Sequence, residues 1–194
     1  MNNHIAIEGL DGVGKTTIAK LLSNRLHLPF VEKPWSLYTD EKGELTHYLQ
    51  LTKQVNQNDN TFFKMCFYSL GTILARQHYP KGLITDRFIT SAVINNRNAL
   101  ESQWMALYST QVSNPALTVV LYATADVRYE RMYQRDCTDP DLKNVAQTDE
   151  QYAMIKSFLD NYQTPYLWID TSNKDCETIV EEILIYWSTS LSHK

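Results

Sequence analysis

Residues 9–16 read Gly9-Leu10-Asp11-Gly12-Val13-Gly14-Lys15-Thr16 and match the pattern G-x-x-x-x-G-K-[ST] at every fixed position. An alternating apolar run at residues 4–8 precedes the match and predicts a buried strand, and the apolar residues after it recur at helical spacing. A strand that passes through a glycine-rich turn into a helix directs backbone N–H groups and a helix N-terminus toward one point. The stretch therefore predicts a P-loop that binds the phosphates of a nucleotide.

The motif also assigns roles to its residues. We expect the Lys15 ammonium to contact the β- and γ-phosphates of ATP, and the Thr16 hydroxyl to bind Mg²⁺. The residues expected to contact ATP belong to the loop and to the start of the helix: Gly9, Asp11, Gly12, Val13, Gly14, Lys15, Thr16 and Thr17.

The composition is that of an ordinary globular protein. The chain has 194 residues, of which 43% are hydrophobic and 21% charged, and its formal net charge is −4. This charge argues against a nucleic-acid polymer as partner, and no apolar run reaches the roughly 18 residues of a membrane span. The start of the chain lacks a secretory signal pattern, and the three cysteines are scattered. We expect a cytoplasmic protein whose partners are small-molecule nucleotides.

Strand-like and helix-like segments alternate along the chain. Strand candidates lie at residues 4–8, 28–32, 82–86, 117–122 and 166–170. Helical patterns lie at residues 61–78, 99–112, 126–135, 147–162 and from Cys176 onward, and the polar stretch 36–60 is expected to hold a short helix at 44–55. This alternation predicts one α/β domain over residues 1–194, with a parallel sheet covered by helices on both faces. Ligands of such sheets bind at the carboxyl ends of the strands.

Two of the predicted strands end in residues suited to phosphoryl transfer. Glu32 ends the second strand, where its carboxylate would bind an acceptor sugar, hold a Mg²⁺-bound water or accept a proton from an acceptor hydroxyl. Asp86 and Arg87 end the third, with the carboxylate placed to bind Mg²⁺ or its water shell and the guanidinium to bind a phosphate. The alternative is that all three are ordinary surface groups at strand ends.

The densest cationic stripe of this acidic chain follows the fourth predicted strand. Arg128, Arg131 and Arg135 lie at i, i+3 and i+7 and share one face of a predicted helix. A polar loop follows at residues 136–141. The pattern favours a lid over about residues 126–146 that places Arg131 and Arg135 against the transferred phosphoryl group when it closes. The alternative is a solvated amphipathic helix.

The helix predicted at residues 61–78 contains four aromatic residues, which are Phe62, Phe63, Phe67 and Tyr68. Aromatic residues at this spacing mostly belong to a core or an interface, but one of them could stack on a nucleobase. We choose Phe63 as the candidate for contact with the substrate base.

The segment from Glu8 to Thr17 resembles the P-loop of thymidylate kinases. The resemblance continues at Asp86-Arg87-Phe88 with Ser91 behind it, at Asn114-Pro115 ahead of the fourth strand, and at the lid arginines Arg131 and Arg135. It implies a P-loop kinase fold with a five-stranded parallel sheet, ATP–Mg²⁺ as phosphoryl donor, and a homodimer packed through helices.

The chain departs from the thymidylate kinase pattern in three places, one of which is that the base-reading arginine expected before the third strand has no clear counterpart near Met65 and Phe67. After the second strand, Lys33 separates Glu32 from Pro34, and Trp35 stands where the family has glycine. Further along, Asn95-Asn96 belongs to the stretch that replaces the family's Ala-Tyr-Gln segment. These departures concern the base of the acceptor, not phosphoryl transfer.

Together the motifs predict a nucleoside monophosphate kinase, with dTMP as the first candidate acceptor. Arg87 would bind the acceptor phosphate and Glu32 its sugar or attacking end, while Lys15, Arg131 and Arg135 stabilise charge on the transferred group. One alternative is a deoxyribonucleoside kinase, in which a carboxylate takes a proton from a 5′-hydroxyl. A further alternative is an ATP-binding switch protein without an acceptor.

Overall fold

The computed structural model describes residues 3–41 and 44–191. Its centre is a parallel sheet of five strands, which are β1 (His4–Glu8), β2 (Phe30–Val31), β3 (Leu83–Asp86), β4 (Leu117–Tyr122) and β5 (Tyr166–Asp170). Their order across the sheet is β2-β3-β1-β4-β5. From the central strand β1 the chain therefore first adds β2 and β3 on one side of the sheet. It then crosses to the other side of β1, where it adds β4 and β5. This arrangement confirms the predicted α/β class and parallel sheet.

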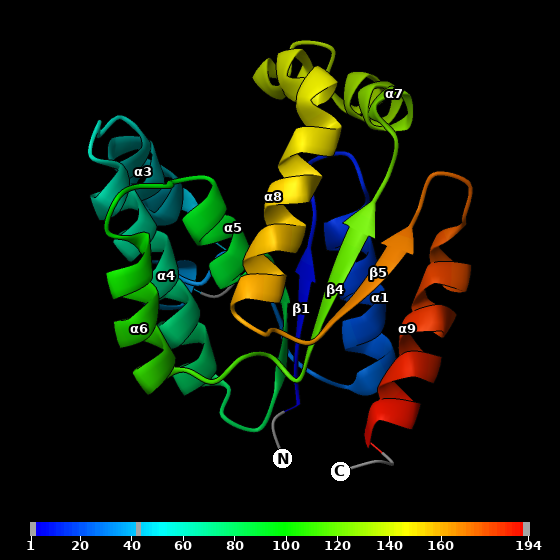
Figure 1. Cartoon of the computed structure of the whole chain (residues 1–194), viewed down its shortest axis with the longest axis horizontal. Coiled ribbons are helices and arrows are strands. Elements are labelled where there is room, and N and C mark those ends of the chain that lie inside the picture. The colour runs from blue at the N-terminus through cyan, green and yellow to red at the C-terminus, as the bar shows by residue number, and fades with distance from the viewer. Residues whose placement is uncertain (1–2, 42–43, 192–194) are drawn as a thin grey trace.

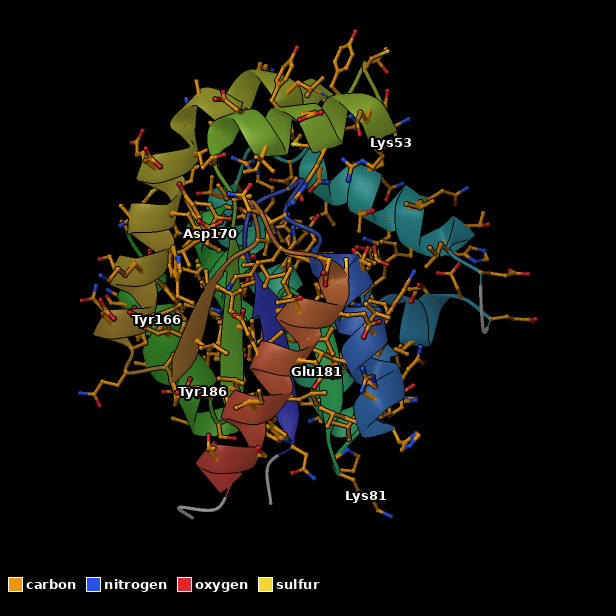
Figure 2. The ribbon with its side chains drawn as sticks, turned by 90° about the vertical axis from the view of Figure 1, so that its right-hand side faces the viewer. Lys53, Lys81, Tyr166, Asp170, Glu181 and Tyr186 are labelled. Carbon is orange, nitrogen blue, oxygen red and sulfur yellow. The ribbon has the colours of Figure 1, made fainter. Side chains whose placement is uncertain are left out.

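Helices cover both faces of the sheet. They are α1 (Lys15–Leu26), α2 (Ser36–Thr39), α3 (Thr46–Asn56), α4 (Thr61–His78), α5 (Ile89–Ile94), α6 (Glu101–Gln111), α7 (Ala125–Arg135), the 3₁₀ helix η1 (Pro140–Gln147), α8 (Thr148–Asn161) and α9 (Cys176–Leu191). Figure 1 shows α1 and α9 on one side of the sheet and α4, α5 and α8 on the other. In the view of Figure 2, α9 lies in front of the sheet, and α7 lies beyond the end of β5 that carries Asp170.

The central strands are apolar on both sides because helices cover both faces. Every residue of β1 is buried, and Ile5 pairs with Ile84 of β3 and with Leu117 of β4. Ile18 and Leu22 of α1 pack on this sheet as part of the core. The core thus fixes the carboxyl end of β1, from which the P-loop starts.

Side-chain caps start some of the helices, including α4 and η1. The Asn60 side chain accepts a hydrogen bond from the Phe63 backbone N–H at 3.0 Å and starts α4. The Asp139 side chain accepts one from the Asp141 N–H at 2.9 Å, and Pro140 occupies the first position of η1. No helix within the described residues has the length and apolar character needed to cross a membrane.

Strand β2 is shorter than the predicted strand at 28–32. It comprises only Phe30–Val31 and pairs with β3 alone, because it lies at the edge of the sheet. Pro29 has no N–H to give to a ladder, although its carbonyl accepts from the Ile84 N–H at 2.8 Å. The short helices α2, α5 and η1 were not predicted from the sequence, because each spans too few residues to show a clear period.

Candidate active site

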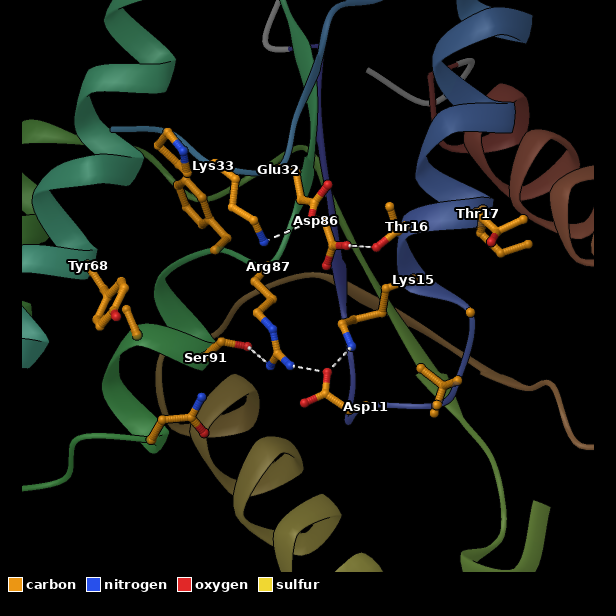
Figure 3. Close-up of a pocket in the computed structure, with 18 of the residues that line it drawn as sticks. Asp11, Lys15, Thr16, Thr17, Glu32, Lys33, Tyr68, Asp86, Arg87 and Ser91 are labelled. Carbon is orange, nitrogen blue, oxygen red and sulfur yellow. Dashed lines mark hydrogen bonds and ion pairs between the residues drawn. The ribbon is translucent and has the colours of Figure 1, made fainter. Parts of the chain in front are cut away.

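A cavity of about 1160 Å³ opens at the carboxyl ends of the strands, next to the P-loop (Figure 3). Its described lining includes seven cationic side chains, which are Lys15, Lys33, Lys64, Arg87, Arg131, Arg135 and Lys174. Only three carboxylates oppose them, and these are Asp11, Glu32 and Asp86. A chain with a net charge of −4 has thus concentrated positive charge in one cavity, which favours a polyanionic ligand.

The P-loop residues line this cavity as expected for phosphate binding. All of the residues predicted to contact ATP are in its wall except Gly9, which lines an adjoining cavity of about 480 Å³. Gly14 precedes α1 with a φ of 91°, in the left-handed region that favours glycine, and no side chain caps the helix. The first N–H groups of α1 are therefore free of a side-chain cap and can bind phosphate oxygens.

Lys15 is nearly buried at the base of the cavity. Its Nζ donates to the Leu10 carbonyl at 2.8 Å and lies 3.2 Å from the Asp11 carboxylate. Burial, together with the positive charge of Arg87, lowers the pKa of Lys15 to about 8. A lysine in this setting gains more from an incoming phosphate than an exposed one, because little water screens the interaction.

Asp11 joins Lys15 to Arg87. One Arg87 nitrogen lies 2.6 Å from the Asp11 carboxylate, and another donates to the Ser91 hydroxyl at 3.3 Å (Figure 3). Burial alone would raise the pKa of Asp11, but the charges of Arg87 and Lys15 hold it well below its usual range. Asp11 therefore stays ionised and holds the two cations together at the place where phosphates are expected.

Hydrogen bonds to Glu8, at the end of β1, hold the backbone around Arg87 in place. The Ser91 hydroxyl donates to the Glu8 carboxylate at 2.5 Å, and the Phe88 N–H donates to the same carboxylate at 2.9 Å. Burial raises the pKa of Glu8, which is fully enclosed at the end of β1. Arg87 itself has a φ of 70°, a conformation that non-glycine residues seldom adopt. The contacts from Glu8 through Ser91 hold Arg87 in this conformation.

Thr16 and Asp86 provide oxygen ligands suited to Mg²⁺. The Thr16 hydroxyl donates to the Asp86 carboxylate, so both side chains lie together at the start of α1 and the end of β3. No cluster of three or more His, Cys, Asp or Glu side chains within the described residues could hold a metal by itself. Mg²⁺ at nucleotide sites takes one or two protein oxygens and completes its shell with phosphates and water, so this pair fits it.

Glu32 and Lys33 form an ion pair on the cavity wall, directly after β2. The Glu32 carboxylate lies 2.7 Å from the Lys33 Nζ, and Figure 3 shows the pair beside Asp86. Both residues line the cavity. The lysine that separates Glu32 from Pro34 therefore adds a cation to the site and neutralises the carboxylate next to it.

The rest of this wall comes from α3 and α4. Tyr68 donates through its hydroxyl to the Asn56 side chain at 2.6 Å, and both residues line the cavity with Tyr48 and Lys64. Phe63 is not in the lining and is 43% exposed. Five residues along a helix correspond to about 140° of rotation, so Phe63 and Tyr68 cannot share a face. Tyr68 replaces Phe63 as the aromatic residue of α4 that faces the cavity.

Of the residues that depart from the thymidylate kinase pattern, Asn95 and Asn96 line the cavity and Trp35 does not. The Trp35 ring stacks on Phe67 with 4.9 Å between ring centroids, and its indole N–H donates to the Phe67 carbonyl at 2.9 Å. Trp35 therefore fixes α4 against the end of β2 without lining the cavity, whereas Asn95 and Asn96 line it.

The arginines of α7 do not act as one stripe. Arg131 and Arg135 line the cavity, where Arg131 donates to the Thr171 carbonyl at 2.8 Å and Arg135 lies 2.6 Å from Asp139. Arg128 is 3% exposed and turns toward the P-loop backbone. The reason is that α7 packs on the P-loop through Arg128 and Met132, which are both buried, whereas Arg135 lies beyond this contact at the end of the helix.

The sequence patterns did not single out several lining residues. Thr171 and Lys174 follow β5, so the rule that ligands bind at the ends of parallel strands could have found them. Tyr48, Asn56 and Lys64 lie on helices, where no local motif distinguishes a cavity-facing polar residue from a solvated one.

A P-loop at the central strand of a parallel sheet, an Asp-Arg pair at the end of β3 and arginines on a helix above the cavity define a P-loop nucleotide kinase. A sequence model of the thymidylate kinase family matches residues 7–183. The chain therefore belongs to the thymidylate kinase family, whose chemistry is nucleotide phosphoryl transfer.

The relatives extend over nearly the whole chain. A probable thymidylate kinase of Methanococcus maripaludis (strain C6) is 24% identical over 191 residues, which is 95% of this chain and 94% of the relative. Among solved structures, deoxyadenosine kinase from M. mycoides superposes with a TM-score of 0.65 at 16% identity, covering 96% of this chain and 99% of that one. YorR from Bacillus subtilis superposes with a TM-score of 0.61 at 17% identity, covering 99% of each. The structural similarities show the same fold.

Proposed function

We propose that this protein transfers the γ-phosphoryl group of ATP to a nucleoside monophosphate, and that dTMP is the acceptor. The family and the names of its relatives support a monophosphate acceptor. The lining of the cavity supports it independently, because its cations extend beyond the P-loop to Lys33, Lys64 and Arg87.

The single observation that carries the proposal is the position of Arg87. Its guanidinium lies across Asp11 from the P-loop lysine, on the side of the cavity that faces Tyr68 (Figure 3). A monophosphate bound there would replace the Asp11 carboxylate as the anionic partner of Arg87. Its phosphate oxygen is already ionised and attacks without a general base, so the protein has to supply position and positive charge.

The remaining roles follow from where the side chains lie. We propose that Lys15, Arg131 and Arg135 stabilise the charge on the transferred group, and that Thr16 and Asp86 hold Mg²⁺, which offsets the phosphate charge when bound. Glu32 would contact the acceptor next to its phosphate, and Tyr68 would pack on its base. In this proposal the described chain acts as one kinase domain, with a lid over about residues 126–146.

A deoxyribonucleoside kinase is the second candidate. The structural similarity to a deoxyadenosine kinase favours it, as does a carboxylate, Glu32, in the cavity wall. A nucleoside hydroxyl stays protonated at neutral pH, so this reaction needs Glu32 as a general base. The ion pair of Glu32 with Lys33 at 2.7 Å counts against that role, because the carboxylate would have to give up this partner to act on an acceptor hydroxyl.

The test is a side-by-side screen of ATP turnover with nucleosides and nucleoside monophosphates, in wild type and in Arg87→Ala and Glu32→Gln. We expect a phosphorylated product from dTMP, a steep rise in the acceptor KM in Arg87→Ala, and substantial kcat in Glu32→Gln. Turnover of thymidine or deoxyadenosine but not of their monophosphates, with loss of kcat in Glu32→Gln, would establish the nucleoside kinase instead. ATP hydrolysis without any phosphorylated acceptor would identify a switch protein.

We further propose that the protein is a cytoplasmic homodimer. Leu70 of α4 and Leu107 of α6 are 42% and 58% exposed, and the two helices are in contact through the rings of Phe62 and Trp104. Apolar side chains left on neighbouring helices support a helix-packed interface. The molar mass in solution, measured by light scattering, should be twice that of the chain and should fall to one chain in Leu70→Lys/Leu107→Lys. The free cysteines Cys66, Cys137 and Cys176 support a reducing compartment.

A further inference from the structure

Arg128 differs from the other arginines of α7 in its surroundings. It is 3% exposed, and its Nε donates to the Asp11 carbonyl at 2.8 Å. A terminal nitrogen donates to the Thr148 hydroxyl at 2.5 Å, at the first residue of α8. One side chain thus joins the lid helix, the P-loop and the helix that follows the lid.

The guanidinium is buried without an ion pair in the described part of the chain, and the oxygens that it contacts belong to a carbonyl and a hydroxyl. The carboxylates of Asp11 and Asp141 act on it only from a distance. Burying a charge without a paired partner costs free energy, and replacing such a group by an apolar one is often neutral or stabilising. Stability therefore gives no reason for an arginine here.

The P-loop and α7 are in close contact at the same place. Gly12 has a φ of 89°, and a Cβ there would lie 2.9 Å from the Arg128 carbonyl oxygen and 3.0 Å from a side-chain carbon of Met132. The first turn of α7 therefore rests directly on the P-loop backbone. Glycine at this position permits the approach, and the hydrogen bond from Arg128 to the preceding residue fixes it.

Asp11 connects this contact to the phosphate-binding cations. Its carbonyl accepts from Arg128, while its carboxylate lies 3.2 Å from Lys15 and 2.6 Å from Arg87. The backbone position of Asp11 decides where the turn presents Lys15, which itself donates to the neighbouring Leu10 carbonyl. A displacement of about 1 Å at reacting groups is enough to cost a hundredfold in rate.

We propose that Arg128 is a positioning residue for phosphoryl transfer: it holds the Asp11 carbonyl against the lid helix, and so keeps Lys15 aligned with the cations that α7 brings to the cavity. The inference rests on the phosphoryl transfer of the proposed function but not on the identity of the acceptor. Arg128 touches no reacting atom and acts through the P-loop backbone.

The experiment compares Arg128→Met, Arg128→Lys and wild type, with Arg25→Met as the matched control at an exposed arginine whose ion pairs are with Glu177 and Glu181. Three quantities are measured: the midpoint of thermal unfolding, the Kd for ATP carrying a fluorescent ribose substituent, and kcat per ATP-binding site. We expect Arg128→Met to keep or raise the unfolding midpoint, to change the Kd by less than about threefold, and to lower kcat by about tenfold or more.

Arg128→Lys, which keeps a charged donor for the Asp11 carbonyl, should recover part of the lost kcat, and Arg25→Met should match wild type. The inference is overturned if kcat per site in Arg128→Met stays within twofold of wild type, or if the lysine variant is no better than the methionine variant. The comparison uses whichever acceptor wild type phosphorylates, or ATP hydrolysis if none is found. A result that dTMP is not the acceptor can thus be distinguished from a result that Arg128 does not position Lys15.

Discussion

At the scale of the residue, the site depends on one lysine whose charge is sensitive to pH. Lys15 is enclosed by the P-loop and lies near Arg87, and these surroundings lower its pKa to about 8. Free enzyme should therefore lose the Lys15 charge as the pH rises through 8. We expect kcat/KM for ATP to be constant below that pH and to fall by about tenfold for each further pH unit, because this parameter reports the free enzyme.

The variant Lys15→Arg separates this titration from others. An arginine stays charged throughout the range, so its profile should lack the fall above pH 8 even though its turnover is lower. In wild type, bound ATP raises the pKa of Lys15 through its negative charge, and the kcat profile should remain flat to higher pH than that of kcat/KM. Identical profiles for the two proteins would assign the titration to another group.

At the scale of the element, α7 brings two cations to the cavity from a surface helix. In the present structure Arg131 donates to the Thr171 carbonyl, and Arg135 is paired with Asp139. Cations that act on the transferred group contribute to the transition state more than to the binding of ATP. We expect Arg131→Met and Arg135→Met each to lower kcat by about a hundredfold and to change the Kd for ATP by less than about threefold.

The measurement pairs steady-state kinetics with equilibrium binding of ATP in the absence of acceptor. Lys143→Met serves as the control, because Lys143 lies in η1 and does not line the cavity. If both arginine variants kept the kcat of wild type, the exposed part of α7 would be a solvated helix face and the proposed lid would be wrong.

Some helices and strands could be predicted from the sequence and others could not. The P-loop, the strands at 4–8, 117–122 and 166–170, and the long helices follow from periodicity and one specific motif. The edge strand β2 was predicted in the right place but too long, and the short helix α5 was not predicted, because both depend on pairing and packing partners that are distant in the chain. For the same reason the sequence does not distinguish Phe63 from Tyr68 or Arg128 from Arg131, since residue type and spacing do not give the rotation of a helix against its neighbours.

In the molecule as a whole, positive charge is concentrated in one cavity although the protein is acidic. The net charge is −4, yet the described lining of the large cavity is cationic. Some of these cations are paired with carboxylates of the same wall: Arg87 with Asp11, and Lys33 with Glu32. These pairings lower the cost of placing the cations close together, and a phosphate that binds there would replace one anionic partner by another.

The opposite end of the sheet gives the whole molecule a pH-dependent stability. His4 is fully buried at the start of β1, with its Nε2 3.0 Å from the Thr85 hydroxyl and its Nδ1 2.8 Å from a nitrogen of Arg76. Burial, with the positive charge of Arg76, holds the pKa of His4 well below its usual value of 6.5. The unfolded chain binds a proton at His4 below pH 6.5, whereas the folded chain does not. Acid therefore favours unfolding through this residue, and its contribution to stability is lost as the pH falls from 6.5 toward the lower folded pKa.

We expect the free energy of unfolding to decrease below pH 6.5 with a slope from His4 that approaches about 1.4 kcal/mol per pH unit. The measurement is urea unfolding at pH 7.5, 6.5 and 5.5 in wild type and in His4→Gln, whose amide can hydrogen-bond but does not titrate. The variant is expected to be less stable at pH 7.5, because glutamine lacks the ring that packs edge-on against Phe88 with 4.6 Å between centroids. Only the difference in slope tests the argument. Between pH 6.5 and 5.5 wild type should lose about 1 kcal/mol more than the variant, and equal slopes would mean that His4 can take up a proton in the folded protein at ordinary pH.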